Sequence, residues 1–143
     1  MSILCVTVLA VLIADQAIKL MVRRLAAGDG VALGPCGSLR VAVGRLWLRR
    51  LGGQFSDLAI WSIWVGATVS LVIAAAFVSI DPVFVGLLVG GSLSHAIESS
   101  VRGFVTDICV RNRAAFNLAD LALAVGAIGI VGEFLIDLHR TLA

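Results

Sequence analysis

Residues 58–78 read LAIWSIWVGATVSLVIAAAFV, without a single ionisable side chain. An α-helix rises 1.5 Å per residue, so about 20 apolar residues cross the roughly 30 Å hydrocarbon core of a bilayer. This stretch is long enough and apolar enough to do so. It therefore predicts a transmembrane helix.

The composition of the whole chain agrees with this interpretation. Of its 143 residues, 60% are hydrophobic and 14% are charged, and the mean hydropathy is +1.08. Soluble domains average about 45–50% apolar and about 25% charged residues. A chain of one domain's length cannot bury so much apolar surface, so we expect an integral membrane protein. The net charge of +2 gives no indication of a nucleic-acid partner.

Three further apolar stretches cover about residues 1–22, 83–97 and 118–138. The first lacks a basic start and a small-residue cleavage site, so we expect it to be a retained helix and not a signal peptide. We expect an all-α membrane protein with four transmembrane helices, forming a single domain over residues 1–143.

The third helix has a recognisable start and a small-residue surface. Asp81 and Pro82 precede it, and these residue types favour the first turn of a helix. Gly86, Gly90 and Gly91 follow within it. Small residues at this spacing allow neighbouring helices to approach closely.

Residues 25–57 form the long connection between the first two helices. Within it Leu39, Val41 and Val43 alternate with smaller or polar residues, and the alternation slips after Gly44. This pattern predicts a strand bent by a bulge, in a small β cradle at the membrane interface. The alternative is a short interfacial helix whose arginines point to lipid headgroups.

Ionisable residues also occur inside the predicted helices, where they are costly and usually functional. Asp15 and Lys19 are four residues apart, so they lie on one helix face and can neutralise each other. Either a structural ion pair or a functional one fits this spacing.

Two further aspartates, Asp107 and Asp120, flank the connection between the last two helices. Carboxylates that approach closely cannot both ionise cheaply, so they share one proton and provide one acid and one base. Such a pair can activate water for attack on a peptide carbonyl. From spacing alone, the alternative is a solvated pair of interfacial aspartates.

Polar and small residues recur in four ordered motifs: Asp15-Gln16-x-x-Lys19, Gly52-x-x-Phe55-Ser56, Gly90-Gly91-Ser92-Leu93 followed by Gly103-x-Val105-x-Asp107, and Phe116-Asn117-x-Ala119-Asp120 with Gly126. Their order and spacing resemble those of the signal peptidase II family, the lipoprotein signal peptidases. The resemblance covers most of the chain.

The resemblance implies a multi-pass aspartyl endopeptidase of the bacterial inner membrane. It would remove the signal peptide of lipid-modified prolipoproteins, with membrane lipid as its surroundings and no cofactor. Asp107 and Asp120 would be the catalytic dyad and Asn117 an orienting residue. Asp15 and Lys19 would be structural support, and residues 25–57 the interfacial cradle.

The chain departs from the family pattern where the family is associated with holding substrate. His95 stands in place of an asparagine, Ser99 in place of an arginine, and Arg50 in place of the asparagine that opens the motif of Gly52 and Phe55. These changes favour an alternative in which the chain is a non-cleaving membrane subunit, or an assembly partner in a larger membrane complex.

His95 itself allows three interpretations. It can be a hydrogen-bonded replacement for asparagine, a proton partner of the dyad, or a ligand of a metal or pigment. Only Glu98 lies near it at ligand spacing, and the three cysteines are not paired at such spacing. We therefore predict no metal site.

Arginines gather in the two long connections, where the sequence has Arg23, Arg24, Arg40, Arg45, Arg49, Arg50, Arg102, Arg111 and Arg113. The positive-inside rule would place these connections in the cytoplasm. The family resemblance implies the opposite face. We expect the extracytoplasmic placement, because arginines in a folded interfacial segment can bind lipid phosphates.

Overall fold

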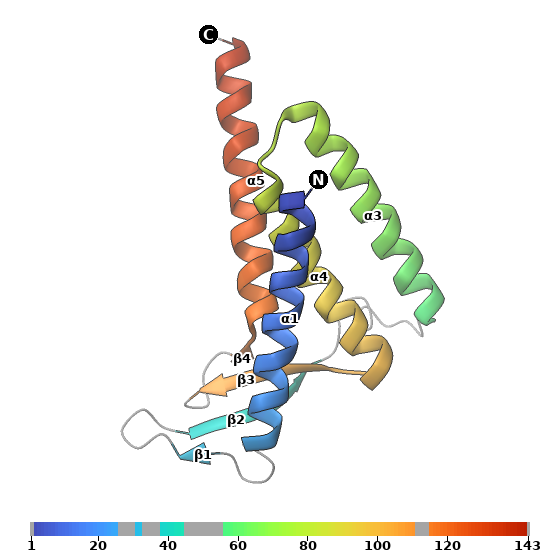
Figure 1. The fold of residues 1–143 in the computed structure, drawn as a ribbon, viewed down its shortest axis with the longest axis vertical. Coiled ribbons are helices and arrows are strands. Elements are labelled where there is room, and N and C mark those ends of the chain that lie inside the picture. The colour runs from blue at the N-terminus through green and yellow to red at the C-terminus, as the bar shows by residue number, and fades with distance from the viewer. Residues whose placement is uncertain (1, 26–30, 33–37, 45–55, 111–114, 143) are drawn as a thin grey trace.

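The computed structural model describes residues 2–25, 31–32, 38–44, 56–110 and 115–142. It confirms four helices that are long and apolar enough to cross a membrane. They are α1 (Ser2–Leu25), α3 (Asp57–Val78), α4 (Pro82–Arg102) and α5 (Leu118–Leu142). Figure 1 shows them above a small sheet that lies at one end of the bundle.

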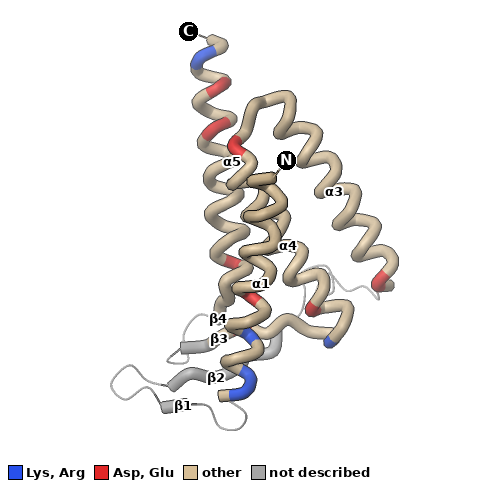
Figure 2. The backbone as a smooth tube through the Cα atoms, viewed as in Figure 1, with Lys and Arg blue, Asp and Glu red and all other residues tan. Residues whose placement is uncertain are grey.

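Helix α4 is the centre of the bundle and packs against α1, α5 and α3. Helix α3 leans away from the others beyond the turn that joins it to α4 (Figure 1). The outward faces of the helices carry exposed large hydrophobic side chains, such as Phe77 and Ile128. Charged residues lie mainly toward the two ends of the bundle (Figure 2). Both features suit a protein surrounded by lipid.

Two adjacent glycines allow α1 and α5 to approach α4 from different sides. A Cβ atom added at Gly90 would lie 3.0 Å from the Val8 carbonyl oxygen of α1. One added at Gly91 would lie 2.7 Å from the Ala119 carbonyl oxygen of α5. Close helix approach at these positions is what the small-residue pattern predicts. It also brings the polar parts of α1 and α5 together.

The turn between α3 and α4 is stabilised by side chains. Ser79 ends α3 in the left-handed region, with φ of 56°. Asp81 caps α4, because its Oδ1 accepts the Val83 N–H at 2.8 Å, and Pro82 occupies the first turn. Glu133 on α5 accepts the Asp81 N–H at 2.6 Å. The expected start of this helix is therefore correct to within one residue.

Helix α4 continues to Arg102, five residues beyond the predicted end near 97. The residues that follow 97 are polar, but Glu98 and Ser99 are buried by neighbouring elements and do not face lipid or water. Gly103 then ends the helix with φ of 76°, and its N–H donates to the Ser99 carbonyl at 2.9 Å. This turn directs the chain into the sheet.

Within the described residues, the sheet has four strands in the order β1 (Val31–Ala32), β2 (Ser38–Gly44), β3 (Val105–Val110) and β4 (Ala115–Phe116). All neighbouring strands are antiparallel. The alternation at 39–43 therefore marks a strand. The bulge after Gly44, and the alternative helix there, fall outside the described residues.

The sheet is larger than the sequence predicted, because half of its strands come from the connection between α4 and α5. Strand β3 pairs with residues 39–44 of β2, with Ala42 opposite Asp107 and Gly44 opposite Val105. Strand β4 returns beside β3, with Ile108 opposite Phe116. This hairpin brings Asp107 back toward the start of α5, where Asp120 lies.

Candidate active site

A buried ion-pair network joins α1 to α4. Lys19 Nζ lies 2.7 Å from Asp15 Oδ2 and 2.9 Å from Glu98 Oε2. All three side chains are fully buried. Buried charges are stable only when they are paired in this way, so each member of the network depends on the others.

On one side the network reaches strand β3. Glu98 Oε2 accepts the Thr106 N–H at 3.1 Å, and the Thr106 hydroxyl also bonds to Glu98. Arg23 of α1 donates to Glu98 at 2.7 Å and to the Thr106 hydroxyl at 2.9 Å. Thr106 immediately precedes Asp107. The network therefore fixes the backbone on which Asp107 is carried.

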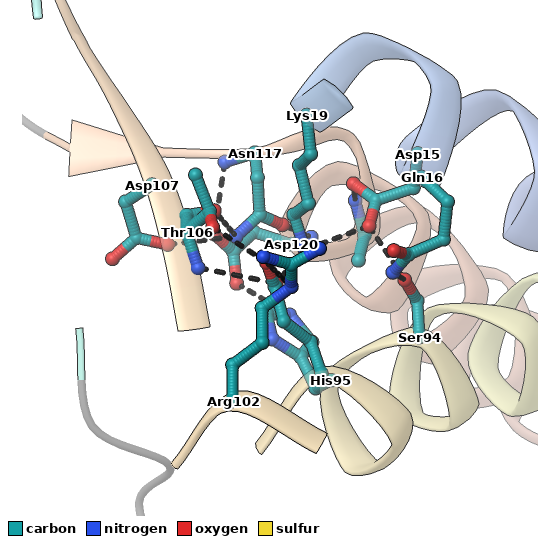
Figure 3. Close-up of polar contacts among 12 residues, drawn as sticks. Asp15, Gln16, Lys19, Ser94, His95, Arg102, Thr106, Asp107, Asn117 and Asp120 are labelled. Carbon is teal, nitrogen blue, oxygen red and sulfur yellow. Dashed lines mark hydrogen bonds and ion pairs between the residues drawn. The ribbon is translucent and has the colours of Figure 1, made fainter. Parts of the chain in front are cut away.

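On the other side the network reaches the start of α5. Asp15 Oδ1 accepts the backbone N–H of Ala119 at 3.0 Å, while Ser94 donates to Asp15 Oδ2 at 2.6 Å. Gln16 donates in turn to the Ser94 hydroxyl at 2.8 Å. Ala119 immediately precedes Asp120. The same buried network thus holds the residue before each of the two aspartates (Figure 3).

Asn117 connects the two aspartates directly. Its Nδ2 donates to Asp107 Oδ1 at 2.7 Å, and its backbone N–H donates to Asp120 Oδ2 at 3.0 Å. The Asp120 N–H donates back to Asn117 Oδ1 at 2.9 Å. Asn117 therefore caps α5 in a reciprocal capping box, and this one nearly inaccessible residue contacts both carboxylates, Asp107 through its side chain and Asp120 through its backbone.

The surroundings of Asp107 differ from those of an ordinary surface carboxylate. Burial raises its pKa, and the nearby negative charge of Asp120 raises it further. The hydrogen bond from Asn117 and the charge of His95 act in the opposite direction, and the net shift is upward. A raised pKa keeps the proton on Asp107 to a higher pH, which suits the acid of a proton-sharing pair.

His95 of α4 lies beside the second aspartate. Its Nε2 is 3.2 Å from Asp120 Oδ1, an ion-pair contact whose angles fall outside hydrogen-bond geometry. The imidazole is 12% exposed and the Asp120 side chain 45% exposed. The described residues contain no group of three His, Cys, Asp and Glu side chains that could hold a metal ion.

The structure gathers most of the residues that the sequence singled out. Asp15, Lys19, His95, Asp107, Asn117 and Asp120 form one contiguous polar region. Arg50, Gly52 and Phe55 lie outside the described residues. The sequence predicted Arg23 as one of the connection arginines that can bind lipid phosphates, whereas it lies in α1 and pairs with Glu98, and it gave no role to Thr106. Arg23 follows Asp15 and Lys19 at the same four-residue spacing, and that periodicity was the available signal.

Together, the fold and this region define a polytopic membrane protein with a pair of aspartates held at one end of its helix bundle. The model of the signal peptidase II family matches residues 7–136. The chain belongs to the signal peptidase II family. It is a multi-pass protein of the bacterial inner membrane.

Individual relatives agree with this assignment. The lipoprotein signal peptidase of Escherichia coli O157:H7 is 34% identical, over 88% of this chain and 85% of the relative. That of Cronobacter sakazakii is 32% identical, over 88% of this chain and 84% of the relative.

Solved structures share the fold. A bacterial membrane enzyme solved at 1.9 Å by the in meso method superposes with a TM-score of 0.65 at 22% identity, over 92% of this chain and 91% of that one. A second, solved at 2.3 Å, has the same TM-score at 23% identity, over 98% and 92% of the two chains.

Proposed function

We propose that this chain is an aspartyl endopeptidase that removes the signal peptide of lipid-modified prolipoproteins, with Asp107 and Asp120 as its catalytic dyad. The observation that carries the proposal is the bridge by Asn117, which binds Asp107 through its side chain and Asp120 through its backbone. The lipoprotein signal peptidases that the chain resembles supply the substrate class.

The reaction requires one carboxylate and one carboxylic acid. The carboxylate takes a proton from a water molecule as the water oxygen attacks the scissile carbonyl carbon, and the acid protonates the carbonyl oxygen. When the C–N bond breaks, the carboxyl group that received the water's proton passes it to the leaving amine. The second carboxylate recovers its proton from the tetrahedral intermediate, so the pair returns to its starting state.

The remaining predicted residues have supporting roles in this proposal. Asn117 orients the two carboxyl groups, while Asp15 and Lys19 hold the backbone positions that precede them. Arg50, Gly52 and Phe55 would contact the substrate from the interfacial segment. The single domain of residues 1–143 would present its site at the extracytoplasmic face of the membrane.

Reconstitution tests the proposal. The purified protein, in liposomes with a diacylglyceryl-modified prolipoprotein, should release a product lighter by the mass of the signal peptide. Asp120→Asn should abolish release. Asp137→Asn is the matched control, because Asp137 is exposed near the far end of α5, and it should leave the rate unchanged. Release that persists in Asp120→Asn would exclude the dyad.

A second function is favoured by one observation: both aspartates also stabilise local structure. Asp120 completes the capping box of α5, and Asp107 is bonded to the capping residue. A non-cleaving membrane subunit could retain them for this reason alone. Purification in mild detergent distinguishes the two functions, since the subunit should retain a stoichiometric partner and the peptidase should be a monodisperse monomer.

A further inference from the structure

His95 is the residue at which this chain departs from its family and at the same time contacts the dyad. The family pattern has an asparagine at this position, a side chain that carries no charge. Here an imidazole nitrogen lies 3.2 Å from Asp120 Oδ1. An imidazole is the side chain whose charge changes in the physiological pH range.

This contact gives the carboxylate of Asp120 more polar partners than that of Asp107. Both oxygens of Asp120 are occupied, Oδ1 by His95 and Oδ2 by the Asn117 N–H. Among the described residues, Asp107 has a partner on one oxygen, Oδ1, which accepts from the Asn117 side chain. An imidazole nitrogen beside one oxygen and a backbone donor on the other stabilise the negative charge of Asp120 more than that of Asp107.

We propose that His95 is a positioning residue that keeps Asp120 as the carboxylate, so that Asp107 holds the proton that the two share. The inference rests on the proposed peptidase function. Asp120 would then accept the proton from the attacking water, and Asp107 would donate its proton to the carbonyl oxygen. His95 itself exchanges no proton with the substrate.

The charged groups near the imidazole determine which side chains His95 can influence. Asp120 on α5 and Asp107 on β3 are the carboxylates that interact with it. The charged groups of the neighbouring network are Lys19 and Arg23 on α1 and Glu98 and Arg102 on α4. The one charged residue of α3 is Asp57, in its first turn. Lys19 and Glu98 are paired within the buried network. The aspartates are therefore the groups whose charge responds to His95.

Nuclear magnetic resonance of the protein labelled with ¹⁵N-histidine tests the pairing without any substrate. The chain has two histidines, and His139, exposed in the last turn of α5, serves as an internal reference. The ring ¹⁵N shifts of His95, followed across a pH series, should differ between the wild type and Asp120→Asn because the contact with the Asp120 carboxylate is lost. Those of His139 should not differ. Identical His95 shifts in the two proteins would overturn the inference.

The pH dependence of cleavage tests whether His95 affects the activity of the two aspartates. The dependence of kcat on pH should differ between the wild type and His95→Asn, because asparagine carries no ionisable group beside Asp120. His95→Ala should lower kcat at the wild-type optimum by about tenfold, less than the roughly 10²–10⁴-fold loss of a group that transfers the proton itself. His95→Asn should restore most of that loss, because asparagine is the family's residue.

Control variants separate the inference from the proposed function. His139→Gln should match the wild type at every pH. Superimposable kcat profiles for the wild type and His95→Asn would overturn the role of His95 even if both cleave. A wild type that cleaves nothing would overturn the peptidase function, while the ¹⁵N titration would still decide whether His95 and Asp120 are paired.

Discussion

Asp15 on α1 accepts the backbone N–H of Ala119 on α5 at 3.0 Å, although 104 residues separate them in the chain. Asp15 is also paired with Lys19, which pairs with Glu98, which binds the backbone of Thr106. One buried chain of contacts therefore links the residues that precede Asp120 and Asp107. The geometry of the dyad depends on charges that do not themselves face the substrate.

Lys19→Met should destabilise the protein strongly. The substitution leaves the Asp15 and Glu98 carboxylates close together without their shared cation, and breaking a buried ion pair from one side costs about 3–5 kcal/mol. Thermal unfolding in detergent measures the effect. Arg24→Met is the control, because Arg24 is exposed one turn further along α1, and it should change the melting temperature little. Equal melting temperatures for the two variants would contradict a structural role for the network.

Replacements of Asn117 should separate its two roles. Asn117→Ala removes both the cap of α5 and the bond to Asp107, so it should cost about 0.5–2 kcal/mol of stability and abolish cleavage. Asn117→Ser retains a capping oxygen but has no amide to reach Asp107. It should therefore melt close to the wild type and still cleave poorly. Full activity in Asn117→Ser would show that the bridge to Asp107 is dispensable.

The raised pKa of Asp107 predicts how its stability contribution changes with pH. Because folding favours the protonated form, the contribution is fully present below the unfolded value of about 3.8 and is lost as the pH rises through the folded value. Asp107→Asn mimics the neutral form and removes this dependence. Its melting temperature at neutral pH should equal or exceed that of the wild type, since Asn Oδ1 can still accept from Asn117. A clear fall in Asp107→Asn at neutral pH would indicate a purely structural aspartate.

Gly91→Ala should disturb the site through the backbone. Its Cβ would lie 2.7 Å from the Ala119 carbonyl oxygen, so α5 must move and Asp120 with it. Overpacking of this kind costs about 1–3 kcal/mol, and the displacement should also lower the cleavage rate. Gly66→Ala on α3 is a matched control, because nothing lies within 4 Å of the added atom. The two variants should differ in both melting temperature and rate, and similar behaviour would contradict close packing at Gly91.

The helices were predictable from the sequence because they depend on local signals. A run such as residues 58–78 defines a span by itself, and the capping pattern of Asp81 and Pro82 marks the start of α4. The spacing of Asp107 and Asp120 alone left a solvated pair as the alternative, and the dyad was predicted from the resemblance of ordered motifs to a known family. Its catalytic role stays a prediction.

The contacts that depend on distant residues were not predictable. The pairing of β3 with β2 joins two separate connections, and residues 105–110 are too short and irregular to identify a strand by alternation. The interior position of Glu98 depends on Lys19 and Arg23, which are supplied by another helix. A polar residue near the predicted end of a span therefore gave the wrong boundary for α4.

The most direct test of the account compares cleavage rates of Asp107→Asn, Asp120→Asn and the variant with both changes, in liposomes with a diacylglyceryl-modified prolipoprotein. Residues that act as one unit are not additive, since losing either member removes the function of both. Each single variant should therefore cleave as slowly as the double variant, with all three still folded. A single variant that cleaves at the wild-type rate, or losses that multiply in the double variant, would contradict a catalytic dyad of Asp107 and Asp120.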